Sequence, residues 1–580
     1  MAPFSSRFSV RTLAGFSRRT APLAPAAAAV VLLSLPFVHD VGAAEPPSAE
    51  GKVAAAATDN ADATRAAMEI MAQGGSAADG AIAAALVLGV TSPTGSGIGG
   101  GGFALVYSAH DKTTTVADFR ETAPRGFDPE VFAKKRESRG VLVGVPGEPA
   151  GLEWLSRKLG RKTLAEDAAS AVSLARRGFY VSHHTASAIG HFGEKIGRSP
   201  ALSKDLVPNG NPLGFGARAT RPDLARTLER FGVEGKRALY EGAIAQRIVE
   251  ATKAQGGALD AKDLADYAVR ERKPLTKTFG TRTVITMPAP SAGGLMLLET
   301  LGMLGADASS PTAKLGYGSS AYLHTVAEAM RFSLADRVRV VGDPDLDPDV
   351  PTKVDALLAD ARLAAAKARI FPDKTTKMAS LVSREQGTSH IVVVDGDGNV
   401  VSLTTTINSP FGAAIVADGT GVLLNDELDD FSLPADVGPL APPGLLPNRP
   451  RTLARPVSSM TPTIVLEDGV PVLALGGSGG QRIATEVTQA ALCRLVFARD
   501  PSACVSLPRM HVAMSGELFV ERDVPEDVRE GLKKRGEPVK DELPVAPAVQ
   551  MISVSDARDP ARRTLRAAAD PRKGGLASAR

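Results

Sequence analysis

The sequence is poor in aromatic residues and has almost no net charge. Tryptophan, tyrosine and phenylalanine make up 4% of its 580 residues, whereas hydrophobic residues of all kinds reach 44%, which is ample for a core. Lysine and arginine number 67 against 64 acidic residues, giving a formal net charge of +3. No basic stripe with interleaved aromatic side chains is present, so nucleic-acid binding has no support. The composition is typical of a soluble globular enzyme.

Cysteine is also scarce, with two in the chain, Cys493 and Cys504. Export would permit a disulfide between them, and two buried thiols are the alternative. Neither cysteine forms a metal-binding motif with a nearby histidine. His324 and Glu328 stand one helical turn apart, but no third ligand is near them in the sequence. We therefore predict no metal site.

The first 44 residues have the pattern of a signal peptide. A positive segment precedes an apolar run at residues 23–38, and small residues at 41–44 offer a cleavage site. The run is shorter than the roughly 20 residues that span a bilayer, so an uncleaved anchor is the less favoured alternative. The pair Arg18-Arg19 hints at twin-arginine export. The sequence thus predicts a periplasmic or secreted protein. The positive segment contains Arg7, Arg11, Arg18 and Arg19.

Small residues dominate the segment that follows. Residues 52–88 read as helical, with a stop at Gly74-Gly75 and a second, almost wholly apolar helix at residues 78–88. The glycine-rich run TSPTGSGIGGGG at residues 91–102 then leads into a strand. A phosphate-binding loop would instead open a helix or contain a GKS/T sequence. We therefore favour close backbone packing as the reason for these glycines.

The centre of the sequence is a Gly387-Thr388 step that runs directly into a strand. Residues 391–394 and 400–407 flank the turn DGDGN, a good hairpin pattern. Threonine is a weak nucleophile without an adjacent base, and one solution is to place it at the start of a chain, where its own α-amine is the base. The alternative is an ordinary β-branched residue that begins a strand.

One further residue has the chemistry of substrate recognition. Arg120, in the sequence DFRETAP, could bind a carboxylate with two parallel hydrogen bonds. An ion pair with a neighbouring acid is the alternative. Glu427 and Asp430 are close in the sequence, and by themselves they favour a solvated loop.

These residues form one ordered series that resembles the γ-glutamyltransferases (glutathione hydrolases) of the N-terminal-nucleophile hydrolase superfamily. The matching segments include SGIGGGGF, DFRETAP, GVPG, PAPSAGG, TSH, the DGDGN turn, LNDELDDFS, RPVSSMTPTIV and GGSGGQRI. The resemblance implies an α/β (α+β) fold, a four-layer αββα sandwich. It also implies that the precursor cuts itself between Gly387 and Thr388, giving a large subunit, residues 45–387, and a small catalytic subunit, residues 388–580.

The resemblance also assigns roles to individual residues. Thr388 would be the nucleophile, Thr406 would hydrogen-bond its hydroxyl, and the amides of Gly479 and Gly480 would form the oxyanion hole. Arg120 would hold the α-carboxylate of the γ-glutamyl group together with Ser458 and Ser459. Asn408, Glu427 and Asp430 would hold its α-ammonium.

The implied reaction is attack of Thr388 on the γ-amide of glutathione or a related donor, followed by resolution of the ester by water or by an amino-acid or dipeptide acceptor. No cofactor, nucleic acid or stable membrane insertion is expected, and the two subunits would form a heterodimer. A related acylase acting on glutaryl-β-lactams is the alternative, although Asp430 argues against it. A second alternative is not an enzyme: a binding protein that keeps the fold but no longer cleaves itself.

Residues 433–454 depart from the family pattern. The segment has six prolines and no aromatic residue, and Ala454 replaces a basic residue that usually precedes Arg455. Little apolar mass would then close over the donor. The sequence predicts an open cleft that admits poly-γ-glutamyl chains, and it predicts little change in KM on deletion of residues 436–446.

Overall fold

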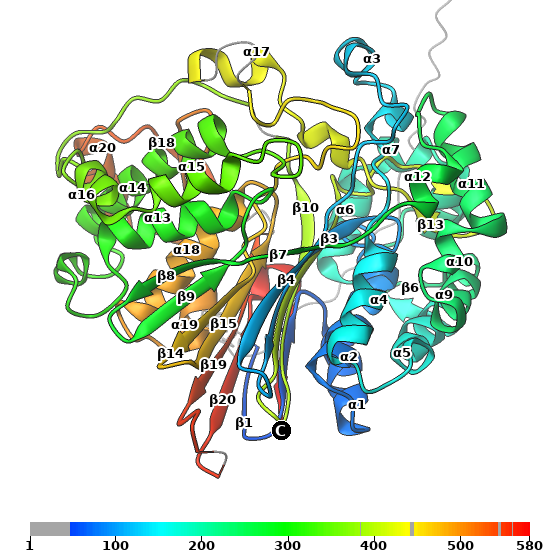
Figure 1. The fold of residues 1–580 in the computed structure, drawn as a ribbon, viewed down its shortest axis with the longest axis horizontal. Helices are drawn as coiled ribbons and strands as arrows, with labels where there is room; N and C mark the ends of the chain where they lie inside the picture. Colours follow the sequence, from blue (N-terminus) through cyan, green and yellow to red (C-terminus); the bar gives the residue numbers. More distant parts are fainter. Residues whose placement is uncertain (1–46, 383, 441–445, 543–546, 560) are drawn as a thin grey trace, which may run out of the picture. The chain divides into compact units, whose positions relative to one another are not determined.

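The computed structural model describes residues 47–382, 384–440, 446–542, 547–559 and 561–580. The predicted signal peptide and its cleavage site lie outside the described residues. Within residues 45–580, two seven-stranded sheets pack face to face, and helices cover their outer faces (Figure 1). The fold is therefore the predicted αββα sandwich.

The first sheet is antiparallel throughout. Its strands, in spatial order, are β1 (Ser48–Gly51), β20 (Thr564–Ala569), β19 (Ala548–Ser555), β15 (Val470–Ser478), β14 (Thr463–Glu467), β9 (Arg282–Thr286) and β8 (Leu275–Phe279). Helices α13 (Gly293–Leu304), α14 (Ser320–Val340) and α18 (Arg482–Leu495) form the layer outside it.

The second sheet is also antiparallel. Its order is β21 (Leu576–Ala579), β2 (Ala55–Thr58), β10 (Gly387–Val394), β11 (Val400–Asn408), β3 (Gly101–Ser108), β4 (Thr113–Phe119) and β7 (Arg270–Arg272). The layer outside it includes α1 (Ala61–Ala72), α2 (Ala77–Thr91), α4 (Glu148–Leu159), α5 (Leu164–Arg177) and α9 (Pro222–Glu234).

Burial explains why the central strands are almost continuously apolar. The β10 strand lies between α2 on one face and β15 on the other, and every residue from Thr388 to Val394 is buried. A strand with both faces covered has no reason to alternate polar and apolar residues. Helix α2 is buried on all sides and begins with a capping box between Ser76 and Asp79.

The remaining elements are short and lie between or beside these layers. The helices are α3 (Pro129–Lys134), α6 (His183–His191), α7 (Gly193–Gly197), α8 (Pro200–Leu206), α10 (Arg237–Tyr240), α11 (Gly242–Lys253), α12 (Ala261–Ala265), α15 (Val350–Leu357), α16 (Asp360–Lys367), α17 (Pro434–Val437), α19 (Pro501–Ser506) and α20 (Glu526–Lys534). The strands are β5 (Phe179–Tyr180), β6 (Arg218–Ala219), β12 (Val416–Ala417), β13 (Val422–Leu423), β16 (Met510–Val512), β17 (Leu518–Glu521) and β18 (Val539–Glu542).

One predicted helix is wrong, the predicted hairpin is confirmed, and the state of the two cysteines is now known. Residues 55–58 form β2 and not the start of a helix, because this alanine-rich segment pairs with β10 and β21; tertiary pairing overrides the helix propensity of alanine. The hairpin of β10 and β11 is confirmed. Cys493 and Cys504 are joined by a disulfide, with Cα atoms 5.6 Å apart.

Strands from before and after Gly387 pair with each other in both sheets. In the second sheet, β10 pairs with β2 and β11 pairs with β3, so strands on the two sides of this residue share hydrogen bonds. In the first sheet, β14 from the later half pairs with β9 from the earlier half. A cut at residue 387 would therefore leave the two pieces bound along both sheets.

Candidate active site

Thr388 lies at the start of β10, where the pairing with β11 is irregular. Its side-chain Oγ1 accepts a hydrogen bond from the backbone N–H of Gly479, with N and O 2.6 Å apart. The hydroxyl of Thr406, on β11, donates to the carbonyl oxygen of Gly387 at 2.8 Å and accepts from the N–H of Asn408 at 2.8 Å. With the 387–388 peptide intact, Thr406 thus contacts the carbonyl before Thr388 and not the Thr388 hydroxyl.

The two glycines after β15 have backbone conformations that suit glycine. Gly479 has φ 132° and Gly480 has φ 62°, in the region where L-residues are strained. A Cβ atom on Gly480 would also lie 2.2 Å from the carbonyl oxygen of Glu385. Glycine therefore allows the 385–388 segment and the amide of Gly479 to approach each other closely.

The glycine-rich run packs against the same two threonines. A Cβ atom on Gly95 would lie 2.7 Å from the backbone oxygen of Thr388, and one on Gly100 would lie 1.9 Å from that of Thr406. Close backbone packing is thus the reason for these glycines, and the prediction made in preference to a phosphate loop is confirmed.

Lys573 is a member of the site that sequence reasoning missed. Its ammonium lies in a 3-10 turn at Pro571–Lys573 and donates to the backbone oxygen of Thr388 at 2.8 Å. The same group donates to Ser478 Oγ at 2.7 Å and pairs with Asp59 at 3.1 Å. The lysine is 185 residues from Thr388 and belongs to no recognisable catalytic motif. Its local sequence, DPRKGG, gives no signal for a role at Thr388.

The nearest histidine in sequence is not placed to act as the base for Thr388. His390 is fully buried, and its ring nitrogens contact Thr404 Oγ1 at 2.9 Å and Ser402 Oγ at 3.2 Å. Burial, together with the charge of Lys573, lowers the pKa of His390 to about 3. The imidazole is therefore neutral and held by its own sheet.

Arg120 and the two predicted acids meet in a buried cluster. The guanidinium, 1% exposed, pairs with Glu427, and it reaches Asp430 Oδ2 at 2.7 Å. It also donates to the carbonyls of Pro456 at 3.1 Å and Val457 at 2.9 Å. The fold thus brings Arg120 together with two acids that lie more than 300 positions later in the chain.

The charged groups of this cluster change one another's pKa. Burial raises the pKa of Glu427 and Asp430 well above their ordinary values, and the Glu385 carboxylate adds to the rise at Asp430, while Arg120 opposes it. Burial alone would lower the pKa of Arg120, but the two acids outweigh this and raise it. Glu427 Oε2 and Asp430 Oδ1 are buried without a hydrogen-bond partner among the described residues. The cluster therefore has acceptors that remain free for a cation.

The two predicted serines are close to this cluster but have other partners. Ser459 Oγ accepts a hydrogen bond from Arg337 at 2.5 Å, and Arg337 also pairs with Glu385. Ser458 Oγ accepts from the N–H of Met460 at 3.1 Å. Neither serine contacts Arg120 in this state.

The proline-rich segment approaches the cluster closely. A small cavity of about 30 Å³ beside Asp430 is lined by Leu446, which is buried, and by Asn448. The Asn448 side chain donates to the carbonyl of Asp430 at 2.7 Å and accepts from the N–H of Val457 at 2.9 Å. Asn448 thus binds the proline-rich segment to the cluster, and the open cleft stays a prediction. Pro442 and Pro443 lie outside the described residues.

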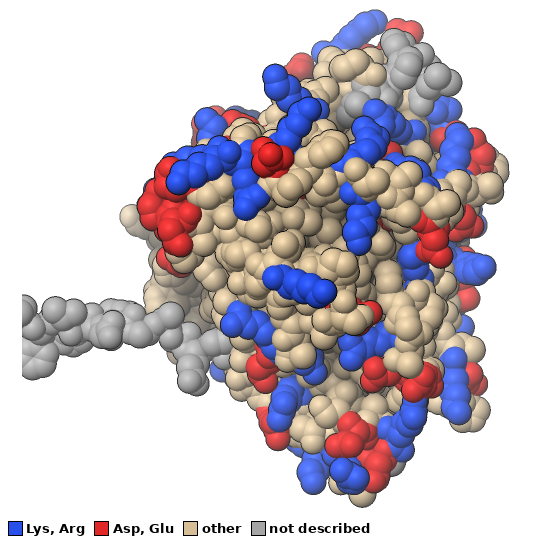
Figure 2. Space-filling model, turned by 90° about the vertical axis from the view of Figure 1, so that its left-hand side faces the viewer, with Lys and Arg blue, Asp and Glu red and all other residues tan. Residues whose placement is uncertain are grey.

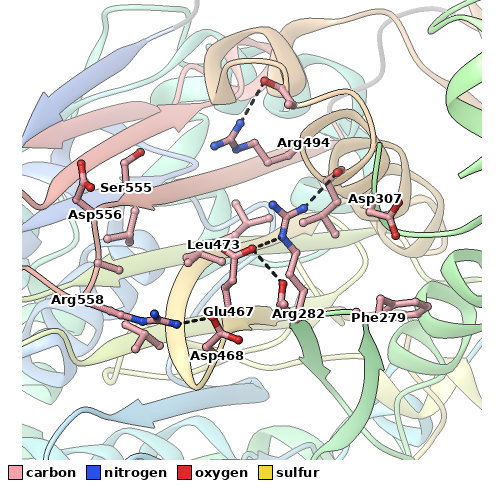
Figure 3. A pocket seen from close by; sticks show the side chains of 18 of the residues that line it. Phe279, Arg282, Asp307, Glu467, Asp468, Leu473, Arg494, Ser555, Asp556 and Arg558 are labelled. Atoms are coloured by element: carbon pink, nitrogen blue, oxygen red, sulfur yellow. Dashed lines mark hydrogen bonds and ion pairs between the residues drawn. The ribbon is translucent and has the colours of Figure 1, made fainter. Parts of the chain in front are cut away.

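A much larger cavity, about 890 Å³, lies at the opposite end of β15 and contains none of the predicted site residues. Figure 3 shows that several of its charged groups pair with one another: Arg282 contacts Glu467 at 3.0 Å, and Arg558 contacts Asp468 at 2.5 Å. Although this cavity is large, we do not assign the reaction to it, because Thr388, Gly479 and Arg120 do not line it.

On the face in Figure 2, basic and acidic side chains are interspersed without a continuous basic stripe.

In the described part of the chain, no group of three or more His, Cys, Asp or Glu side chains could hold a metal ion. His324 instead contacts Glu537 at 2.6 Å, and Glu328 contacts Arg331 at 2.7 Å. No helix within the described ranges is both long and apolar enough to cross a bilayer.

Several known proteins are similar to this chain in sequence. The sequence profile of the Gamma-glutamyltranspeptidase family matches residues 63–580. The chain is 35% identical to "Glutathione hydrolase 2" of Arabidopsis thaliana over 583 residues, covering 95% of this chain and 98% of the relative. It is 34% identical to the "Glutathione hydrolase proenzyme" of Bacillus subtilis (strain 168), covering 84% of this chain and 85% of that protein.

A solved structure with the same fold is a cephalosporin acylase from Bacillus halodurans. It superposes with a TM-score of 0.80 over 92% of this chain and 97% of the acylase, at 24% sequence identity. At that identity the likeness concerns the fold alone.

Proposed function

The chain belongs to the γ-glutamyltranspeptidase family, and from that membership we infer that it is a self-processing γ-glutamyltransferase with glutathione hydrolase activity. The observation that best supports this proposal is the pair of hydrogen bonds at residues 387–388. The Gly479 amide contacts the Thr388 hydroxyl, and the Thr406 hydroxyl contacts the Gly387 carbonyl.

The same contacts support self-cleavage. A hydrogen bond from Thr406 polarises the Gly387 carbonyl, which is the atom group that the Thr388 hydroxyl would attack. The attack would move the acyl group from the Thr388 nitrogen to its oxygen, and water would then release Gly387 as a carboxylate. Thr388 would be left as the first residue of the small subunit, with a free α-amine that can serve as base.

We propose that this amine then activates the Thr388 hydroxyl against the γ-carbonyl of the donor. The α-amine has an ordinary pKa of about 8, close to neutrality. The Gly479 and Gly480 amides would stabilise the developing oxyanion, a contribution of roughly 3 kcal/mol for each well-placed donor. The leaving amine departs with a proton, and water or an acceptor amine then cleaves the γ-glutamyl ester.

The zwitterionic end of the γ-glutamyl group fits the Arg120 cluster. Its α-carboxylate would bind Arg120, with Ser458 and Ser459 nearby, and its α-ammonium would bind Glu427 and Asp430, with Asn408 in support. In the present state Arg120 occupies both acids. Donor binding would therefore replace the two internal ion pairs of Arg120 by ion pairs with the substrate.

An acylase specific for glutaryl groups is disfavoured by the same cluster. A glutaryl group has the carboxylate but lacks the ammonium. It would leave two acids without a cation once its carboxylate had taken Arg120, and buried unpaired charges are costly.

We also propose that the mature enzyme is a heterodimer of residues 45–387 and 388–580 that functions outside the cytoplasm. The pairing of strands across the cut supports the heterodimer, and the disulfide is compatible with export.

A denaturing gel with N-terminal sequencing tests the proposal directly. The purified protein should give two bands, the smaller beginning at Thr388, and should release p-nitroaniline from γ-glutamyl-p-nitroanilide but not from glutaryl-p-nitroanilide. A single full-length band without activity would indicate a binding protein and contradict the proposal.

A further inference from the structure

A groove with several basic side chains adjoins the proposed donor site. One cavity of about 450 Å³ is lined by Arg136, Arg139, Lys195 and Arg198 and by the acids Glu137, Glu194 and Asp426. A second cavity of about 330 Å³ is lined by Arg139, Arg198 and Arg247 and by the acids Glu250 and Asp418. The two cavities thus adjoin at this pair of guanidinium groups, and we call them together the Arg139 groove.

The groove is connected to the reaction centre by adjacent residues. Lys195, on α7, donates to Ser409 Oγ at 2.7 Å, and Ser409 follows Asn408, which pairs with Gly387 across the sheet. Asp426 lines the groove, whereas Glu427, the next residue, contacts Arg120. A single step along the chain therefore separates a wall of the groove from the donor-binding cluster.

Arg139 has no carboxylate partner among the described residues. Its guanidinium donates to the carbonyl of Ala414 at 2.7 Å and to the side-chain oxygen of Gln255 at 2.8 Å, both neutral acceptors. The other cations of the groove have acids nearby: Arg198 contacts Glu194 at 2.8 Å, and Lys195 lies 3.7 Å from Asp426.

Two arginines that face one cavity favour an anion between them. Burial, and then the charge of Arg198, lowers the pKa of Arg139, so an anion in the groove would relieve both effects. Arginine also binds a carboxylate with a fixed, bidentate geometry. Arg136, by contrast, is already paired with Asp429 and Asp436.

We propose that the Arg139 groove binds a carboxylate on the part of the substrate beyond the γ-carbonyl, with Arg139 as its anchor and Arg198 and Lys195 in support. The favoured substrates are γ-glutamyl compounds whose leaving amine bears an acidic group, such as a peptide with a free C-terminus or a γ-linked glutamyl chain. Because the leaving amine and the acceptor amine occupy the same side of the ester, acidic acceptors use the same groove.

This proposal rests on the proposed function, since the donor cluster accounts only for the γ-glutamyl head. Whatever is attached to the γ-amide must lie outside that cluster, and the Arg139 groove is the adjoining space with a cation that no acid neutralises.

The test compares an acidic donor with its neutral amide. Hydrolysis of glutathione and of its glycine carboxamide is measured for the processed native enzyme, R139Q, R198Q and the exposed control R226Q. For R139Q, the ratio of kcat/KM for the acid to that for the amide should fall about three- to tenfold, the scale of one partly buried ion pair. R198Q, whose contact is on the surface, should show about a twofold fall, and R226Q none.

Transfer to glycylglycine and to its amide separates the two sources of the carboxylate. The acid-to-amide ratio should fall in R139Q for donors and for acceptors, and a fall confined to one of them would contradict a groove shared by both. If the acid-to-amide ratio were the same in all four proteins for donors and acceptors alike, the groove would be a solvated surface and the proposal would be overturned. Failure of the native enzyme to cleave γ-glutamyl-p-nitroanilide would instead overturn the proposed function.

Discussion

The ammonium of Lys573 lies 2.8 Å from the backbone oxygen of Thr388 and 3.1 Å from the carboxylate of Asp59. A buried lysine at the first residue of the proposed small subunit places a positive charge near the α-amine that the cut would create. A nearby cation disfavours protonation of an amine and lowers its pKa. Lys573 therefore favours the neutral form that can act as a base.

Replacing Lys573 by Met should shift the acid limb of the kcat/KM profile to higher pH, by up to about one unit. The comparison is made with K573R, which keeps the charge, and with the D59N/K573M double variant, which avoids leaving Asp59 buried without a partner. The measurement is hydrolysis of γ-glutamyl-p-nitroanilide across pH. An acid limb that stays in place in both Met variants would restrict Lys573 to a structural role.

Maturation should depend on the Thr388 hydroxyl. T388A should remain a single uncut chain and lack activity, because the nucleophile for the acyl shift is gone. T388S should still be cut, since serine supplies the same hydroxyl. The check is a denaturing gel of the three purified proteins. A T388A preparation that yields two bands would show that another group or a protease makes the cut.

Both charged ends of the donor should be needed for efficient turnover. R120Q or D430N should lower kcat/KM for γ-glutamyl-p-nitroanilide. The loss corresponds to about 2 to 5 kcal/mol of transition-state stabilisation, the cost of truncating one partner of a buried charge pair. Processing should still occur in both, and this is verified by gel before the kinetics. Near-native turnover by either variant would place that residue in an ion pair without a role in binding.

A pH-dependent stability is expected from Glu299, far from Thr388 in sequence. This side chain is buried on α13, and burial, with the Asp336 carboxyl beside it, raises its pKa well above the usual value. The folded state therefore binds the Glu299 proton more tightly than the unfolded chain. The stability that this provides is present below pH ~4.3 and is lost as pH rises toward the folded-state pKa.

E299Q cannot titrate at this position, so the Tm of the variant relative to that of the native protein should increase between pH 4 and pH 8. The control is E234Q, which removes a surface acid whose pKa is lowered by Arg230. Thermal unfolding curves that stay parallel for native and E299Q protein across this range would mean that Glu299 does not change protonation on folding.

The sequence predicted the features that depend on neighbours along the chain. The hairpin around DGDGN needs only a turn and two apolar runs, and it is confirmed. The strand at residues 55–58 was missed because alanine favours helices, and only its two neighbouring strands decide otherwise. The disulfide between Cys493 and Cys504 was left open, because cysteine spacing alone does not fix their geometry.

At the candidate site, the resemblance selected residues that the fold brings together, but it did not give their partners. Arg337 holds Ser459 and Glu385 across 122 and 48 residues, and nothing local to these residues indicates that contact. The roles assigned to Thr406, Ser458 and Ser459 remain predictions, since in the uncut chain their hydroxyls contact other groups.

The proline-rich segment changes what is expected of the cleft. The Asn448 side chain binds the carbonyl of Asp430 and the N–H of Val457. The carbonyl of Val457 in turn accepts a hydrogen bond from Arg120. Asn448 therefore connects the proline-rich segment to the acidic and to the basic side of the donor cluster. Each hydrogen bond contributes about 1 kcal/mol, and more when its loss leaves a buried group without a partner. Removing this side chain should therefore loosen the arrangement of Asp430 relative to Arg120.

N448A should raise KM for glutathione about five- to thirtyfold, the range for one to two lost hydrogen bonds, and should leave processing intact. Deletion of residues 436–446 should raise KM as well, contrary to the expectation from the prolines, because Leu446 is part of the wall beside Asp430. The exposed control is L453A, in the same segment but 47% exposed. If KM for glutathione were unchanged in N448A and in the deletion, the segment would cover the cleft without shaping the donor site.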